Sequence, residues 1–150
     1  MTTLAEVISK YHLPAKEILE AEHGTITIED DQDIIVDLIK ELREKISKYM
    51  SFIEHLMQPD SDMTELLESS QFTEKEREDM YQLYRELMKA HREYYLEYLT
   101  FNEQTQVTYY KKLLTLWITK KEQVRLIVSK ALQAWNEDQS LQEAKQSYLG

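Results

Sequence analysis

Hydrophobic residues recur at steps of three and four along most of the chain beyond residue 30, and this spacing predicts long helices. One run covers residues 31–58, a second 73–99 and a third 102–136. Such steps place side chains on one face of an α-helix, so each run carries an apolar stripe. A shorter run predicts a small helix near 62–70. The third run also fits a heptad frame, which is typical of coiled-coil packing.

The first thirty residues predict two short helices followed by an extended linker. One helical face carries Leu4, Val7, Ile8 and Tyr11. The second short helix is expected to begin at Pro14, because proline suits a first helical position, and to end at Gly24. Residues 25–29 alternate like a strand. They have no second strand to pair with, so we expect an extended linker.

The helix ends carry recognisable signals. No Gly or Pro occurs between Pro59 and Gly150, so that stretch has few tight turns. A capping box at 73–76 begins the second long helix, and 100–103 offers another. An unbroken helix through both would be too long for a domain of this size, so we expect the chain to turn back near residue 100. Residues 140–143 offer a cap for a short terminal helix.

These elements predict an all-α protein, an elongated antiparallel bundle of three long helices. The 150 residues fit a single domain, in which 1–30 holds the short helices and linker and 31–150 holds the bundle. Hydrophobic residues make up 42% and charged residues 31%, which are values of a globular chain.

Composition excludes several classes of function. The absence of Cys removes disulfides, thiol nucleophiles and Cys-based zinc sites. No apolar run approaches the roughly 20 residues of a membrane helix, and the first residues lack a secretory signal, so we expect no membrane and a cytoplasmic location. No nucleophile elbow or phosphate-binding loop is present, and we expect no cofactor.

Charge is distributed unevenly along the chain. The net charge of −10 argues against non-specific binding to nucleic acid. The last fifty residues nevertheless carry seven Lys and Arg against five Asp and Glu, whereas the first hundred carry 11 against 23. The basic third helix either packs beside acidic helices or forms a docking face for an acidic protein.

Helical geometry sorts the cations of this third helix into two groups. Four are expected to be solvated on the side away from the apolar stripe: Lys111, Lys112, Arg125 and Lys130. Lys120 and Lys121 lie nearer the stripe. We expect them to reach out past the core or to pair with acids such as Glu41 or Glu86. The solvated four are the candidate partner-binding cations.

Two apolar residues of the same helix, Ile118 and Leu126, do not share its main stripe. Buried Ile and Leu side chains contribute roughly 1.5–3 kcal/mol each, so the two could sustain a modest homodimer interface. The preferred hypothesis is therefore a non-enzymatic interaction or scaffold protein that forms a homo-oligomer.

One histidine has a spacing that is found in metal sites. Glu20 and His23 match the Glu-x-x-His spacing of ferritin-like di-iron proteins, which place two such motifs in a helical bundle. His55 and His91 lack the matching Glu three residues earlier. We therefore expect no metal site.

The segment from Arg85 to His91 carries the main enzymatic alternative. An Arg followed by His at this spacing is similar to the catalytic motif of HEPN-domain ribonucleases, which are all-helical and of about this size. The resemblance implies that Arg85 and His91, paired across a dimer, act on the 2′-hydroxyl and the leaving group of RNA. Glu86 departs from the small polar residue usual after the Arg. His91 also lies on the apolar stripe with Leu87, where a buried His bonded to a Tyr hydroxyl is ordinary.

Tyrosines concentrate in one part of the chain, since seven of the ten fall between Tyr81 and Tyr110. Tyr suits the boundary between core and water. Beside the lysines of the third helix, these rings could also stack single-stranded nucleic acid. A third hypothesis is therefore a small helical subunit of a nucleoprotein complex that uses the basic face of 102–135.

Overall fold

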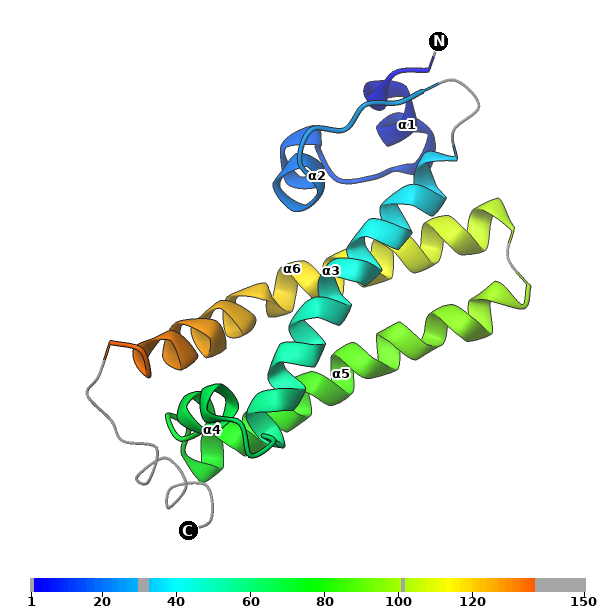
Figure 1. The fold of residues 1–150 in the computed structure, drawn as a ribbon. Coiled ribbons are helices and arrows are strands. Elements are labelled where there is room, and N and C mark those ends of the chain that lie inside the picture. The colour runs from blue at the N-terminus through cyan, green and yellow to red at the C-terminus, as the bar shows by residue number, and fades with distance from the viewer. Residues whose placement is uncertain (1, 30–32, 101, 137–150) are drawn as a thin grey trace.

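A computed structural model describes residues 2–29, 33–100 and 102–136 and shows an all-α fold (Figure 1). Its helices are α1 (Leu4–Tyr11), α2 (Lys16–His23), α3 (Ile34–Met57), α4 (Met63–Ser69), α5 (Glu74–Tyr98) and α6 (Glu103–Gln133). The expected bundle of three long helices is confirmed, and the boundaries of those helices lie within three residues of the expected ones. None of the described helices has an apolar stretch long enough to cross a membrane.

The long helices form two layers. Helices α5 and α6 run antiparallel as a hairpin, and α3 crosses that hairpin diagonally (Figure 1). Helix α3 packs against both of them, and it also contacts α2 near its beginning and α4 near its end. It is therefore the central element of the fold.

The apolar stripes of the three long helices meet in one core. Each stripe contributes side chains that are almost fully buried, including Leu42 and Ile46 of α3, Leu87 of α5, and Tyr110 and Leu113 of α6. At the end of α6, Ala131 and Ala134 are still buried, whereas the larger Leu132 and Trp135 are exposed.

The helix caps follow the sequence signals with two differences. Thr73 and Glu76 form the expected capping box of α5. Helix α6 is instead capped by Asn102 and Thr105, because Thr100 still belongs to the last turn of α5, where its N–H donates to the Glu97 carbonyl at 3.1 Å. Helix α2 starts at Lys16, so Pro14 stands just before it rather than at its first position. The terminal cap expected at 140–143 lies outside the described residues.

The short N-terminal helices are fastened to the bundle by a buried carboxylate at the end of α2. The Glu22 side chain is only 2% exposed. Its oxygens accept from Lys121 Nζ at 2.6 Å, from Trp117 Nε1 at 2.8 Å and from Lys45 Nζ at 3.1 Å. Burial opposes ionisation of Glu22, but the hydrogen bonds from both lysines and the indole outweigh it and keep the pKa of its carboxyl below the usual value. One side chain thus joins α2 to both α3 and α6.

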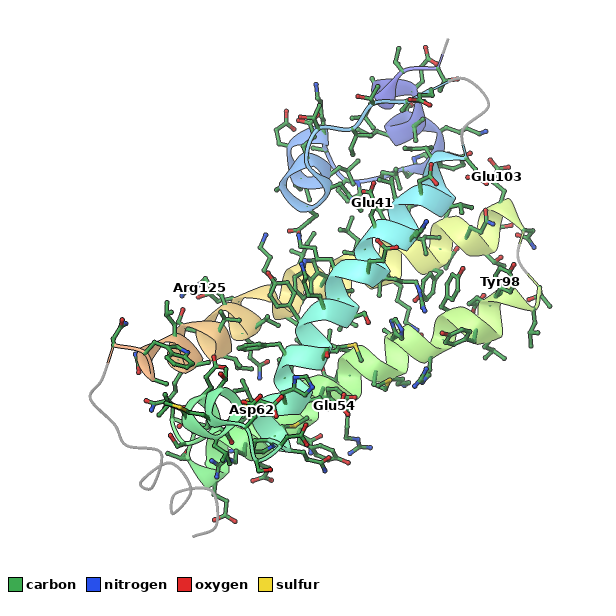
Figure 2. All side chains as sticks on the ribbon, in the orientation of Figure 1. Glu41, Glu54, Asp62, Tyr98, Glu103 and Arg125 are labelled. Atoms are coloured by element: carbon green, nitrogen blue, oxygen red, sulfur yellow. The ribbon has the colours of Figure 1, made fainter. Side chains whose placement is uncertain are left out.

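The next residue, His23, adds a second polar link. Its Nε2 lies 2.7 Å from the Tyr110 hydroxyl, and its Nδ1 lies 3.1 Å from a carboxylate oxygen of Glu41, which is labelled in Figure 2. Burial lowers the pKa of His23, so the neutral ring donates from Nδ1 to Glu41 and accepts from Tyr110 at Nε2. Glu22 and His23 together hold α2 in place.

Candidate binding surfaces

Arg43 is the centre of a polar network between α3 and α5. Its Nη1 donates to the His91 carbonyl at 2.7 Å and to the Tyr109 hydroxyl at 3.3 Å, and that hydroxyl donates on to the Ala90 carbonyl at 2.9 Å. Its Nη2 lies 3.3 Å from His91 Nε2. The guanidinium also lies over the Tyr94 ring, 3.8 Å from the ring centroid. Residues of α5 and α6 therefore hold this α3 side chain in place.

One edge of the Arg43 guanidinium remains open. A guanidinium has five N–H donors. Two on Nη1 and one on Nη2 are used by His91 and Tyr109. Within the described part of the chain, no acceptor is found for Nε–H or for the second N–H of Nη2. These two donors form the side-on edge that grips carboxylates and phosphates in pairs.

Arg43 lines an open groove of about 570 Å³ between α3 and α5. The groove is bordered by Val36, Lys40, Arg43, Glu44, Ser47, Lys48, Ser51, His91 and Tyr94. Its volume falls within the range of roughly 300–1,000 Å³ that is common for ligand sites. Three cations face it against one carboxylate, so an anionic group is favoured there.

Arg85 and His91 lie on different sides of α5. His91 lines the groove, whereas Arg85 is exposed, with its guanidinium carbon 5.9 Å from the centroid of the Tyr81 ring. Six residues turn a helix by about 600°, which leaves the two side chains roughly 120° apart. Within one chain they share no site, and the ribonuclease hypothesis stays a prediction that needs a second subunit.

His91 is half-buried and touches Arg43 rather than a Tyr hydroxyl. Burial and the positive charges of Arg43 and Arg92 lower its pKa, so the neutral ring accepts from Arg43 at Nε2 and carries its proton on Nδ1. That Nδ1 is buried and has no hydrogen-bond partner among the described residues. The His bonded to a Tyr hydroxyl is His23 instead.

Most cations of α6 are neutralised by carboxylates. Lys120 pairs with Glu86 at 2.8 Å, as expected, and Lys121 pairs with Glu22 rather than with Glu41. The cations expected to be solvated also have partners: Lys112 with Glu93, Arg125 with Glu122, and Lys130 with Glu76. Only Lys111 of the predicted four has no carboxylate partner in the described part of the chain. The docking role of these residues stays a prediction.

The cations without a carboxylate within 4.0 Å gather instead on α3 and α5. Among the residues described, those of these two helices are Lys40, Arg43, Lys48, Arg77, Arg85, Lys89 and Arg92. Three of them line the groove. Eight of the seventeen described Lys and Arg residues lack such a carboxylate, and seven of these eight lie on α3 and α5. The strongest candidate for a cationic surface is therefore the α3–α5 side.

Large apolar side chains are exposed at several places, which include Ile18, Met63, Leu132 and Trp135, and two further groups are candidates for binding. At the end of α5, Tyr95, Leu96, Tyr98 and Leu99 are exposed by 55%, 69%, 63% and 79%, and we call these four residues the α5 ridge. On α6, Ile118 and Leu126 are exposed by 42% and 55%, which agrees with their expected place off the core face. Figure 2 shows Tyr98 at the turn end of the hairpin and Arg125 towards its other end.

No group of three or more His, Asp or Glu side chains in the described ranges could hold a metal ion. The Glu20 and His23 pair is divided between different partners: Glu20 lies 3.8 Å from Lys16, and His23 contacts Glu41 and Tyr110. Glu20 therefore interacts within α2, and His23 connects α2 to α3 and α6.

Comparison with family models, with curated proteins and with solved structures finds no match to this chain.

Sequence reasoning missed Arg43, Glu22 and the α3–α5 groove. Nothing in a local pattern marks these residues, because Glu22 meets Trp117 and Lys121 across 95 and 99 positions. The ion pairs between α5 and α6 did carry a signal. In each of these pairs the acid precedes residue 103 by about as many positions as the lysine follows it, as an antiparallel hairpin requires. The pairs are Glu93 with Lys112, Glu86 with Lys120, and Glu76 with Lys130.

Proposed function

We propose that this protein is a non-enzymatic interaction module that associates with a second copy of itself through the α5 ridge. The single observation that carries this proposal is the exposure of Tyr95, Leu96, Tyr98 and Leu99 side by side at one end of the molecule. Large contiguous apolar patches on soluble proteins mark interaction sites, and Tyr is enriched in interfaces.

The charge of the ridge favours a second copy as the partner. A two-fold interface brings the same patch of both subunits face to face, so a strongly charged patch would repel itself. Between Tyr95 and Leu99 only Glu97 is charged, although the whole chain carries a net charge of −10. This end of the molecule can therefore face its own copy at little electrostatic cost.

The outer face of α6 is the second candidate for the same contact. Ile118 and Leu126 are eight residues apart, which places them about 12 Å apart along the helix and roughly 80° apart around it. Two separated side chains bury less area than four adjacent ones. We therefore place the homodimer contact at the α5 ridge and keep the α6 pair as the alternative.

Sedimentation equilibrium tests the proposal. The wild-type chain of 18.0 kDa should show twice its monomer mass at high concentration. Leu96→Asp with Leu99→Asp should return the monomer, because charge is then buried in the interface. The matched pair Ile118→Asp with Leu126→Asp should leave the dimer intact.

A monomeric wild type would contradict self-association altogether. Dissociation by the α6 pair alone would move the contact to α6. Since all four substituted side chains are exposed, circular dichroism should show the same helical content in both variants.

A further inference from the structure

We infer that the groove between α3 and α5 is a docking site for an acidic peptide segment of a different partner protein. This inference is separate from self-association, because the groove is lined by Lys40, Arg43 and Lys48 rather than by the ridge. The sequence predicted a docking face for an acidic protein on α6, but most cations of α6 are paired with carboxylates. We therefore place that partner at α3 instead.

Arg43 supplies the main contact. His91 and Tyr109 hold one edge of its guanidinium, and the Tyr94 ring supports its face. The side-on edge has no acceptor within the described residues. A side chain that is already fixed loses little entropy on binding, so its two donors suit the two oxygens of one carboxylate.

Lys40 and Lys48 extend the site along α3. Both are exposed, border the groove and lack a carboxylate partner in the part of the chain that is described. Eight residues separate them, which corresponds to about 12 Å along the helix. One compact anion cannot reach both. Two or three carboxylates spaced along a peptide can reach both lysines and Arg43 together.

Charge favours a peptide over nucleic acid. Glu44 also borders the groove, between the two lysines in sequence, and would repel a continuous run of phosphates. The net charge of −10 repels a nucleic acid, which carries a charge on every nucleotide, more strongly than a peptide with two or three carboxylates. A peptide can place a neutral or basic residue opposite Glu44 and keep its carboxylates for the cations. The border also includes Val36 and Tyr94, which can receive an apolar residue of the same segment.

Selection from a phage-displayed library of random twelve-residue peptides tests the inference. Peptides enriched on the wild-type protein should be rich in Asp and Glu. Replacing their acids by Asn and Gln should abolish binding in a fluorescence anisotropy assay at about 0.15 M salt, where weak surface attraction is screened.

Variants locate the site. Arg43→Lys keeps the charge but loses the paired donors, so affinity should fall about tenfold, the effect of one charge-assisted hydrogen bond. Lys40→Gln with Lys48→Gln should lower affinity at least about threefold, as expected for exposed ion pairs, without disturbing the core. Lys111→Gln, which removes an unpaired cation outside the groove, should leave affinity unchanged.

Three results would overturn the inference: no enriched peptide, enriched peptides without an acidic bias, or acidic peptides that bind the Lys40 and Lys48 variant as well as the wild type. If a twelve-nucleotide RNA bound more tightly than the selected peptides and its binding depended on the same lysines, the ligand of the groove would be nucleic acid and not a peptide. The α5 ridge variants should bind the peptides with wild-type affinity. The experiment can therefore refute self-association at the ridge and peptide binding in the groove independently.

Discussion

Glu22 is the main polar link between the N-terminal helices and the bundle, beside the buried apolar Val7, Leu13 and Leu19. Its carboxylate is buried and accepts hydrogen bonds from Lys45, Trp117 and Lys121, which belong to the two helices it joins to α2. A buried carboxylate that loses its charge no longer attracts its lysines, although the lysines can still reach water. The effect of substitution should therefore be large but not fatal to the fold.

Glu22→Gln should lower the free energy of unfolding by about 1–3 kcal/mol, the range for losing charged hydrogen bonds. Urea denaturation measures this difference. Glu122→Gln is the matched control, because that carboxylate forms an ion pair with Arg125 at the surface, and its removal should cause no measurable change. Equal effects of the two substitutions would contradict the role given to Glu22.

His23 and His91 predict how stability depends on pH. Burial lowers the pKa of both rings below the ordinary value of 6.5. Below about pH 6.5 the two His rings become protonated in the unfolded chain but stay neutral in the folded one. This difference stabilises the unfolded chain. The contribution of the two rings to stability is therefore complete above about pH 6.5 and decreases as the pH falls. The lowered pKa of Glu22 acts separately, because its contribution is lost only below 4.5.

The free energy of unfolding should therefore be lower at pH 5.5 than at pH 7.5. The double variant His23→Gln with His91→Gln should show a smaller difference between the two values. Denaturant titrations at both pH values measure this. An identical pH dependence in the wild type and the double variant would show that other groups control it.

At the scale of the helix, hydrophobic periodicity was sufficient to predict the elements. Leu42 lies on the apolar stripe of α3 and Leu87 on that of α5, and both are buried in the core. Such stripes can be recognised from the sequence because a helical face repeats every three to four residues, regardless of which helix packs against it. The environment of the α6 cations was predicted less well. Periodicity shows which side of α6 they occupy, but not that Glu76 and Glu93 of α5 reach that side.

Leu42→Ala and Leu87→Ala should each lower the free energy of unfolding by roughly 2–5 kcal/mol, since both side chains are almost fully buried and leave cavities. Glu44→Ala, an exposed position on the same helix as Leu42, should change it by at most about 0.5 kcal/mol. Thermal melts compare the three. Equal shifts would mean that the assigned helical faces are wrong.

At the scale of the molecule, the sequence determined the fold class but not the surfaces. A chain without Gly or Pro between Pro59 and Gly150 has few ways to fold other than as long helices. The groove needs α3 and α5 to meet at Arg43 and His91, and the α5 ridge needs Tyr95 and Leu99 to be left uncovered. Both depend on how whole helices pack, which no local pattern contains.

The central claim is that two copies meet at the α5 ridge. Because the chain has no Cys, a single spin label can be placed without interference at Thr100→Cys, beside the ridge, or at Thr119→Cys on the outer face of α6. Pulsed electron–electron distance measurement on each labelled protein tests the claim most directly. We expect strong dipolar coupling between labels at position 100 and weak coupling at position 119. Strong coupling at 119 alone, or none at either position, would contradict the account.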